Sequence, residues 1–178
     1  EDQDVRATFA AQATTDLGDT YQFVLAVAST LDQQTLMAEV KAHSASIQVV
    51  QGDTYNLVHA ADLAIVASGT ATLETALLER PMVIVYRMAP LTYALARLFV
   101  RVPYIGMPNL IAGRCVVPEL IQSQVTAPNI AAAARQLLTD SHTYSVAQEG
   151  LREVRKRLGE PGAAKRAAGL IAQMLEGT

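Results

Sequence analysis

The alternation of short apolar runs with longer amphipathic segments limits the folds open to this 178-residue chain. Apolar runs lie at Tyr21–Val27, Ile47–Val50, Leu63–Val66 and Met82–Val85, and segments with helical periodicity separate them. Strands that are apolar throughout, separated by helices of about ten residues, are typical of a parallel sheet covered on both faces. We therefore predict an α/β fold with a doubly wound, Rossmann-like sheet.

The predicted helices connect these strands and continue after the last one. We expect them at residues 2–15, 32–43, 56–61, 70–79, 91–100, 129–138, 141–158 and 163–176. The stretch from Pro103 to Arg114 is predicted to be irregular, and Pro118 stands where the first turn of a helix tolerates proline. No linker interrupts the pattern, so we predict one domain over residues 1–178 with a terminal helix at 163–176.

Composition excludes several classes of protein. A chain that is 51% hydrophobic and 17% charged is neither disordered nor collagen-like. The single cysteine, Cys115, cannot form an internal disulfide, and no Cys/His cluster has the spacing of a zinc site. No apolar stretch reaches the roughly 18 residues of a membrane span, and the acidic N-terminus does not resemble a signal peptide. A reducing, cytoplasmic setting fits these features, and we expect no metal and no cofactor.

The charge distribution is uneven along the chain. Residues 80–118 hold five arginines and no acidic residue, although the formal net charge of the whole chain is −3. Such a segment favours an anionic partner, either a phosphorylated ligand or an anionic lipid surface. The alternative is that the arginines only keep an apolar segment soluble. Nucleic acid is not an expected partner.

Part of this segment has the pattern of a peripheral membrane helix. Leu91, Leu95, Leu98 and Phe99 share one face of the predicted helix, with arginines at positions 97 and 101. The alternative is that this apolar face packs on the sheet while the arginines remain in solvent.

The turn after the third strand is the richest candidate for ligand binding. Ligands of open α/β sheets bind beyond the carboxyl ends of the strands. There Ser68, Gly69, Thr70 and Thr72 place a glycine and hydroxyls at a helix N-terminus, which favours a diphosphate. An ordinary helix cap is the alternative. Glu74 could reach a ribose hydroxyl, or it could simply be an acid favoured in the first turns of a helix.

Two further polar residues lie in the irregular stretch. Asn109 either holds its own turn or faces a ligand, and the residues alone favour the structural role. Arg114 could reach a phosphate or pair with Glu119. The three histidines have no nucleophile or carboxylate at motif spacing, so a Ser/His/Asp hydrolase is not supported.

Three sequence blocks resemble the C-terminal domain of lipid-A-disaccharide synthases, which are GT-B glycosyltransferases. These blocks are SGTATLE at 68–74, YRMAP followed by LTYALA at 86–96, and PNLIAGR at 108–114 with VPE at 117–119. Residues 27–30 and 162–168 also match, so the resemblance spans nearly the whole chain.

The resemblance implies transfer of diacylglucosamine from its UDP donor to diacylglucosamine 1-phosphate in lipid A biosynthesis. It assigns Ser68, Gly69, Thr70 and Thr72 to the diphosphate, Glu74 to the ribose, and Asn109 and Arg114 to the substrate site. For Asn109 it therefore reverses the structural preference above. It also implies a cytoplasmic protein, peripheral on the inner membrane of a Gram-negative envelope, and a homodimer.

The chain departs from the family at its N-terminus. The acceptor domain, which by resemblance supplies the catalytic base, is missing, as is the Gly-Ser-Arg turn that precedes the first helix of the nucleotide domain. We therefore expect a half-enzyme that is inactive alone. The alternative is a stand-alone domain that binds UDP-linked ligands or a partner without catalysis.

Overall fold

The computed structural model describes residues 12–18, 20–27, 37, 47–99, 102–160 and 162–176. Residues 12–17 are helical. Most residues of the helices predicted at 2–15 and 32–43 lie outside the described residues, as do His43 and Arg101. The remaining elements follow the predicted alternation of strand and helix.

The five strands within the described ranges all pair in parallel, and they lie in two sheets. β1 (Phe23–Val27) pairs with β2 (Ile47–Gln51). β4 (Met82–Tyr86) lies between β3 (Ala64–Ala67) and β5 (Glu119–Ile121). The predicted α/β fold, with parallel strands surrounded by helices, is confirmed, and its described strands are divided between these two sheets. Side chains of both β1 and β3 line a cavity of about 660 Å³, which separates the two sheets.

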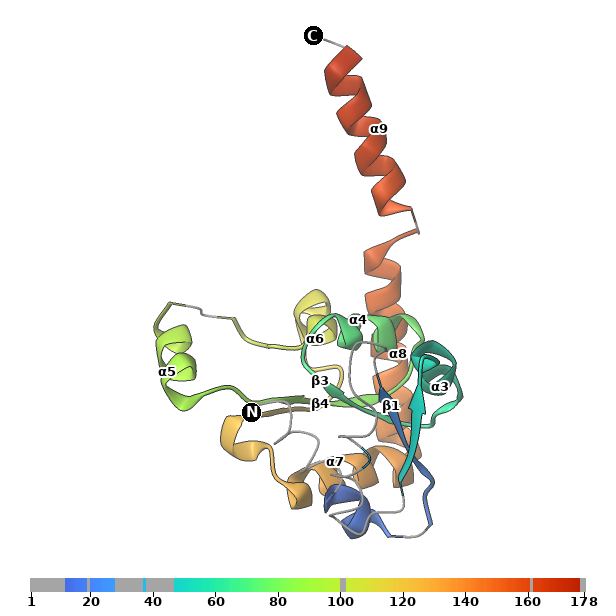
Figure 1. The fold of residues 1–178 in the computed structure, drawn as a ribbon, viewed down its shortest axis with the longest axis vertical. Coiled ribbons are helices and arrows are strands. Elements are labelled where there is room, and N and C mark those ends of the chain that lie inside the picture. The colour runs from blue at the N-terminus through green and yellow to red at the C-terminus, as the bar shows by residue number, and fades with distance from the viewer. Residues whose placement is uncertain are drawn as a thin grey trace.

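The helices surround the three-stranded sheet. In Figure 1, α4 and α6 lie on one side of β3 and β4, and α7 lies on the other side. α8 packs against all three of these helices. The bounds of the helices are α3 Thr54–Ala60, α4 Thr70–Leu77, α5 Pro90–Phe99, α6 Met107–Ala112, α7 Ala127–Thr139, α8 Ser141–Leu158 and α9 Ala163–Glu176.

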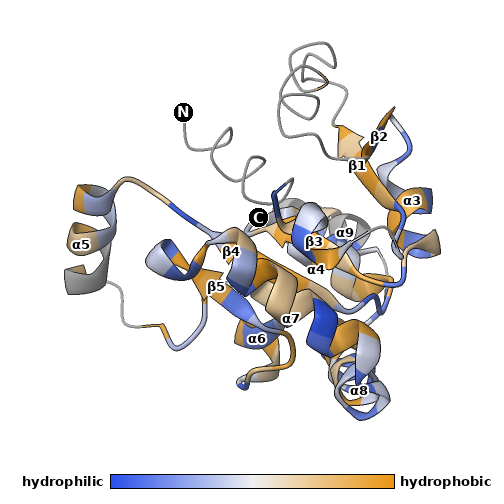
Figure 2. Ribbon diagram, turned by 90° about the horizontal axis from the view of Figure 1, so that it is seen from below, coloured by the Kyte–Doolittle hydropathy of each residue, from blue (hydrophilic) through white to orange (hydrophobic). Residues whose placement is uncertain are grey.

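The core forms around the central strand. Met82, Val83, Ile84 and Val85 are each at most 3% exposed, because β4 is covered by helices on both faces and flanked by strands on both edges. Figure 2, a ribbon coloured by residue hydropathy, shows strongly hydrophobic residues along the strands. The continuous apolar run of the sequence thus identifies the centre of the sheet.

Two elements differ from the prediction for residues 103–124. The stretch predicted to be irregular contains α6, with Pro108 in its first turn and Gly113 in the left-handed conformation at its end, with φ of 69°. The residues after Pro118 form β5 and a short 3-10 turn, Gln122–Gln124, instead of the first turn of a helix. β4 offers a free edge to these residues, and strand pairing there satisfies their backbone groups.

Two helices extend away from the body. Figure 1 shows α5 apart from the other elements and α9 projecting beyond α8. The view in Figure 2 also places α5 apart from the rest.

Candidate nucleotide site

The turn from β3 to α4 is the candidate phosphate site. β3 ends at Ala67, the amide of Ser68 still donates to the carbonyl of Val85 at 3.0 Å, and α4 begins at Thr70. Ser68 is half-buried, whereas Gly69 and Thr70 are exposed. No acidic residue stands in the first turn of α4. The amino end of α4 thus meets solvent at the carboxyl edge of the sheet, where its dipole favours an anion.

Thr72 plays a different part from the one predicted by resemblance. Its side chain is 0% exposed, and its hydroxyl donates to the carbonyl of Gly69 at 2.7 Å. The amide of Thr72 donates to the same carbonyl at 3.1 Å. In the structure Thr72 therefore shapes the turn from inside the protein, and only Ser68, Gly69 and Thr70 present a surface to a ligand.

Glu74 lies one turn farther along α4 and is exposed. Its side chain borders the cavity between the two sheets, together with Ala67 and Ala71. A carboxylate at this place is available to hydroxyl donors of a ligand that enters the cavity from the phosphate turn.

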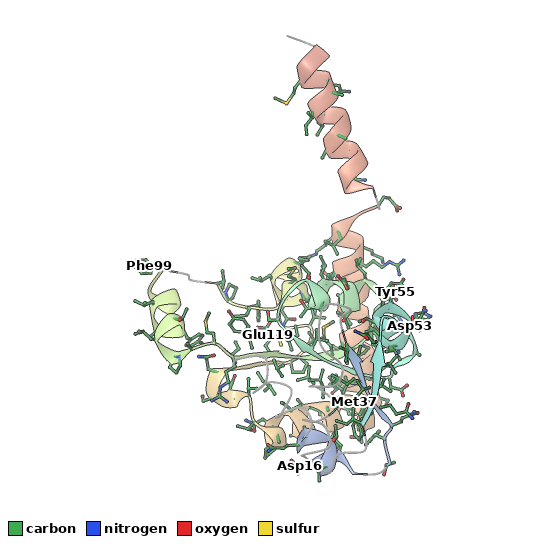
Figure 3. All side chains as sticks on the ribbon, viewed as in Figure 1. Asp16, Met37, Asp53, Tyr55, Phe99 and Glu119 are labelled. Atoms are coloured by element: carbon green, nitrogen blue, oxygen red, sulfur yellow. The ribbon has the colours of Figure 1, made fainter. Side chains whose placement is uncertain are left out.

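A second segment reaches the phosphate turn from across the sheet. The hydroxyl of Ser68 donates to the carbonyl of Ile105 at 3.3 Å. The carboxylate of Glu119 accepts hydrogen bonds from the amides of Ile105 and Gly106, both at 2.9 Å. Figure 3 shows Glu119 inside the body, near the strands and α6. Glu119 therefore occupies the amino end of α6 and holds the 105–106 segment beside Ser68.

Glycine at position 106 fits this close approach. A Cβ atom here would lie 2.3 Å from Cδ1 of Ile84 and 2.9 Å from Oε1 of Glu119. Any larger residue would therefore have to displace the ends of these two side chains, one of which holds the 105–106 segment in place.

Asn109 is fully buried and completes the same network. Its Nδ2 donates to the carbonyl of Val117 and to Oε1 of Glu119, both at 2.8 Å. Its Oδ1 accepts from the amides of Val116 at 2.7 Å and Val117 at 3.1 Å. The side chain is 0% exposed, and both its amide nitrogen and its amide oxygen form hydrogen bonds within the protein. It connects α6 to the residues that lead into β5.

The structure does not bring Arg114 to the phosphate turn. Its guanidinium pairs with Glu153 of α8 at 2.8 Å, and not with Glu119, which the sequence offered as a partner. The hydrogen bond from Arg114 and the nearby charge of Arg157 hold the pKa of Glu153 below its usual range. Arg157 also donates to the carbonyls of Ile111 and Ala112. These arginines belong to the carboxyl end of α6, whereas the segment that contacts Ser68 precedes its amino end.

Sequence reasoning missed Glu119 and Gln122 as determinants of the site. Oε1 of Gln122 accepts from the amide of Met88 at 2.8 Å, and Nε2 of Gln122 donates to the carbonyl of Met88 at 3.0 Å. Gln122 thus fixes the chain where it leaves β4. The sequence carries no signal for this role of Gln122, because a single glutamine after a short strand is also what an ordinary surface position would show.

Other chemistries find no support in the part of the chain that the structure describes. No group of three or more His, Cys, Asp or Glu side chains in that part could hold a metal ion. None of the helices described there is long and apolar enough to cross a membrane. Burial raises the pKa of the Cys115 thiol, and the charge of Glu119 raises it further, which does not favour the reactive thiolate.

Comparison with known proteins identifies the family. The family model described as lipid-A-disaccharide synthetase matches residues 5–174, which is nearly the whole chain. The chain belongs to the lipid-A-disaccharide synthetase family. The parallel strands and surrounding helices are consistent with a Rossmann-like half of a GT-B enzyme.

Curated relatives agree with this family. The chain is similar to the lipid-A-disaccharide synthase of Syntrophus aciditrophicus, with 43% identity over 148 residues. That match covers 83% of this chain and 39% of the relative. The lipid-A-disaccharide synthase of Anaeromyxobacter dehalogenans is 44% identical over the same coverage, and that of Myxococcus xanthus is 40% identical over 154 residues, or 86% of this chain and 40% of the relative. The chain therefore spans about two fifths of the length of these family members.

Proposed function

We propose that this chain is the UDP-sugar-binding part of a lipid A disaccharide-forming glycosyltransferase. Its donor would be UDP-diacylglucosamine, its acceptor diacylglucosamine 1-phosphate, and its product lipid A disaccharide 1-phosphate. The observation that carries the proposal is the solvent-facing turn Ser68–Thr70 at the amino end of α4, within a chain that belongs to this family.

The geometry of this turn supports the proposed binding of the donor. We assign the diphosphate to the amino end of α4, with Ser68 and Thr70 as hydroxyl partners. A helix N-terminus stabilises a nearby anion by about 0.3–1 kcal/mol at an exposed site. Glu74 would accept hydrogen bonds from the ribose hydroxyls. Thr72 and Asn109 would act indirectly, because both side chains are buried and hydrogen-bonded within the protein.

The proposed reaction is a substitution at C1 of the donor sugar. The 6-hydroxyl oxygen of the acceptor forms the new bond to C1, the bond from C1 to the diphosphate oxygen breaks, and UDP leaves with the electron pair. Negative charge grows on the diphosphate, where the α4 dipole and the turn hydroxyls stabilise it. The hydroxyl proton goes to a base, which we assign to the portion of the family's longer chains that this chain does not match.

We further propose that the reaction takes place at the cytoplasmic face of the inner membrane, because both proposed substrates carry acyl chains. We accordingly propose a peripheral protein whose nucleotide site works close to a lipid surface.

Calorimetric titration with UDP tests the nucleotide assignment on this chain. We expect saturable binding to the wild type and a loss of about 10- to 100-fold in affinity for Glu74→Ala, since a hydrogen bond to a charged group contributes about 1.5–3 kcal/mol. Arg114→Ala is the matched control, because Arg114 pairs with Glu153 away from the turn. Absence of UDP binding by a folded wild-type chain, or equal losses in both variants, would contradict the assignment.

A further inference from the structure

Ser68 already donates, within the protein, the proton that a diphosphate would need. Its hydroxyl lies 3.3 Å from the carbonyl oxygen of Ile105, and because a carbonyl can only accept, the hydroxyl is the donor. A hydroxyl carries one proton and two lone pairs. The amide of Ser68 donates to the carbonyl of Val85, so both donors of this residue have partners in the protein. In this state the hydroxyl oxygen presents only lone pairs to a ligand.

The carbonyl that accepts this proton belongs to a peptide group that Glu119 holds from the opposite side. The carbonyl of Ile105 and the amide of Gly106 form one trans peptide, in which C=O and N–H point in opposite directions. The amide donates to Oε1 of Glu119 at 2.9 Å, while the carbonyl accepts from Ser68. Hydrogen bonds at the two ends of one peptide polarise and strengthen each other. A single peptide thus connects Glu119 to Ser68.

The side chain of Glu119 is itself fixed. Its Oε2 accepts from the amide of Ile105 at 2.9 Å, and its Oε1 also accepts from the buried Nδ2 of Asn109 at 2.8 Å. Figure 3 shows Glu119 inside the body of the protein. These contacts set the direction of the Ile105 carbonyl, which points toward the phosphate turn.

A diphosphate at this turn and the carbonyl of Ile105 would compete for one proton. Diphosphate oxygens near neutral pH act as acceptors, so Ser68 can donate to them only if it leaves Ile105. The bond to Ile105 is longer than the usual O–H···O distance of about 2.5–3.0 Å. A hydrogen bond to an ionised acceptor is roughly twice as strong as one between neutral groups. The exchange of partners therefore favours the diphosphate.

We propose that Ser68 couples the phosphate turn to the Ile105–Gly106 peptide, and that Glu119 is the positioning residue for this coupling. In the free protein the hydroxyl of Ser68 donates to Ile105. When a diphosphate binds, the hydroxyl rotates toward it and the hydrogen bond to Ile105 breaks. The carbonyl of Ile105 is then released, while its amide stays on Glu119. The inference rests on the proposed function, because it takes a diphosphate as the ligand of this turn.

The released carbonyl lies at one end of the segment that contains α5. This segment leaves β4 at Met88, which Gln122 holds by two hydrogen bonds, and it returns at Ile105. Loss of the bond to Ser68 weakens the hold on the returning end and leaves the hold at Met88 unchanged. Nucleotide binding thereby reaches a part of the chain that does not contact the nucleotide.

The sequence allows this one peptide to be observed directly. Isoleucine is followed by glycine at a single place in the chain, Ile105–Gly106. Protein labelled with ¹³C in the isoleucine carbonyls and with ¹⁵N in glycine therefore gives one cross-peak in an HNCO spectrum. A carbonyl carbon that loses a hydrogen bond resonates at higher field, so the cross-peak reports whether Ile105 is bonded or released.

We expect saturating UDP to move the carbonyl resonance of Ile105 to higher field in the wild type. In Ser68→Ala the resonance should lie at the released position without UDP, and UDP should move it little further. This variant should bind UDP about fivefold more weakly, since the lost bond to the diphosphate is stronger than the bond to Ile105 that no longer has to break. Thr70→Ala is the matched control: it removes another hydroxyl from the turn and should keep the full shift at saturation.

Glu119→Gln tests the positioning role. The variant keeps the size of the side chain but has one acceptor oxygen for two amides, so UDP should move the carbonyl resonance about half as far or less. Glu153→Gln is the matched control, because Glu153 pairs with Arg114 away from the turn, and it should show the full shift. If Glu119 only stabilised the fold, its variant would lower the urea midpoint and keep the wild-type shift, and that result would overturn the positioning role.

Inorganic diphosphate as a second probe keeps the two proposals apart. A shift with diphosphate, together with no UDP binding in calorimetry, would contradict the proposed function and support the coupling. UDP binding without movement of the Ile105 carbonyl, or with an equal movement in Ser68→Ala, would overturn the coupling and leave the proposed function intact. A resonance that moves with neither ligand would also overturn the coupling.

Discussion

Asn109→Ala provides a sharp test of how the site is held together. The substitution removes the acceptor for the buried amides of Val116 and Val117 and one donor to Glu119. A buried group left without its hydrogen-bond partner costs about 1–3 kcal/mol, so the two amides alone amount to about 2–6 kcal/mol. A typical domain has a free energy of unfolding of about 5–15 kcal/mol. We therefore expect Asn109→Ala to lose a large share of its stability.

Urea unfolding measures this loss. The free energy of unfolding of small proteins falls by about 1–3 kcal/mol per molar urea, so the midpoint should drop by about 1 M or more. Asn129→Ala is the matched control, because Asn129 is exposed and its amide group donates to the carbonyl of Gln124 at the surface. If Asn109 instead served only as a direct ligand of the nucleotide, Asn109→Ala would lose UDP affinity while its urea midpoint stayed at the wild-type value. That result would refute the structural role.

Asn109→Asp refines the same test through pH. It places a second carboxylate where the amide nitrogen now donates to Glu119 at 2.8 Å. Repulsion between the two carboxylates raises the native pKa of the introduced acid above its unfolded value of about 3.9. The destabilisation is then absent below the unfolded pKa and develops as the pH rises through the native pKa. The urea midpoint of this variant, relative to wild type, should recover as the pH is lowered. A difference that stays constant with pH would contradict the contact between residues 109 and 119.

Two further predictions follow from shifted pKa values. Hydrogen bonds from the hydroxyl of Thr143 and the amide of His142 lower the pKa of Asp140 at the start of α8, so its stabilisation is present above the unfolded pKa and is lost as the pH falls through the native pKa. Asp140→Ala should lower the unfolding temperature at neutral pH, and a difference from wild type that persists in acid would contradict this. Burial and the charge of Glu119 raise the pKa of Cys115, so iodoacetamide should alkylate this thiol more slowly than it alkylates glutathione at the same mildly alkaline pH. A rate equal to that of glutathione would show that the thiol is not perturbed.

The local elements of the fold could be predicted because their signals are local. The helix at Ser141–Leu158 has the predicted bounds, and the central strand Met82–Tyr86 follows a continuous apolar run. α6 was missed because prolines and glycines surround its six residues, although Pro108 fits its first turn. β5 is only three residues long and begins with Glu119, so its strand conformation depends on pairing with β4.

The candidate site could be predicted only in part, because only some of its contacts are made between residues that are close in sequence. The phosphate turn at Ser68–Thr70 follows from strand, glycine and helix in succession. The partners of Asn109 and Arg114 could not be predicted in this way. Val116 and Val117 meet Asn109, and Glu153 meets Arg114, only in the folded chain. From the residues alone we expect Asn109 to hold its own turn, and the resemblance assigns it to the substrate site. In the structure its side chain connects α6 to the residues that precede β5.

β5 also determines how much the segment that contains α5 can change in sequence and length. Glu119, at the first residue of this strand, fixes Ile105, and Gln122, just after the last one, fixes Met88. The segment that contains α5 therefore has both of its ends, Met88 and Ile105, anchored beside one short strand. The entropy of closing a flexible loop grows only slowly with its length, by about 0.6 kcal/mol for each doubling. Insertions or deletions within this segment should thus cost the sheet and the phosphate turn little, so α5 can diverge in sequence and length while its anchors stay in place.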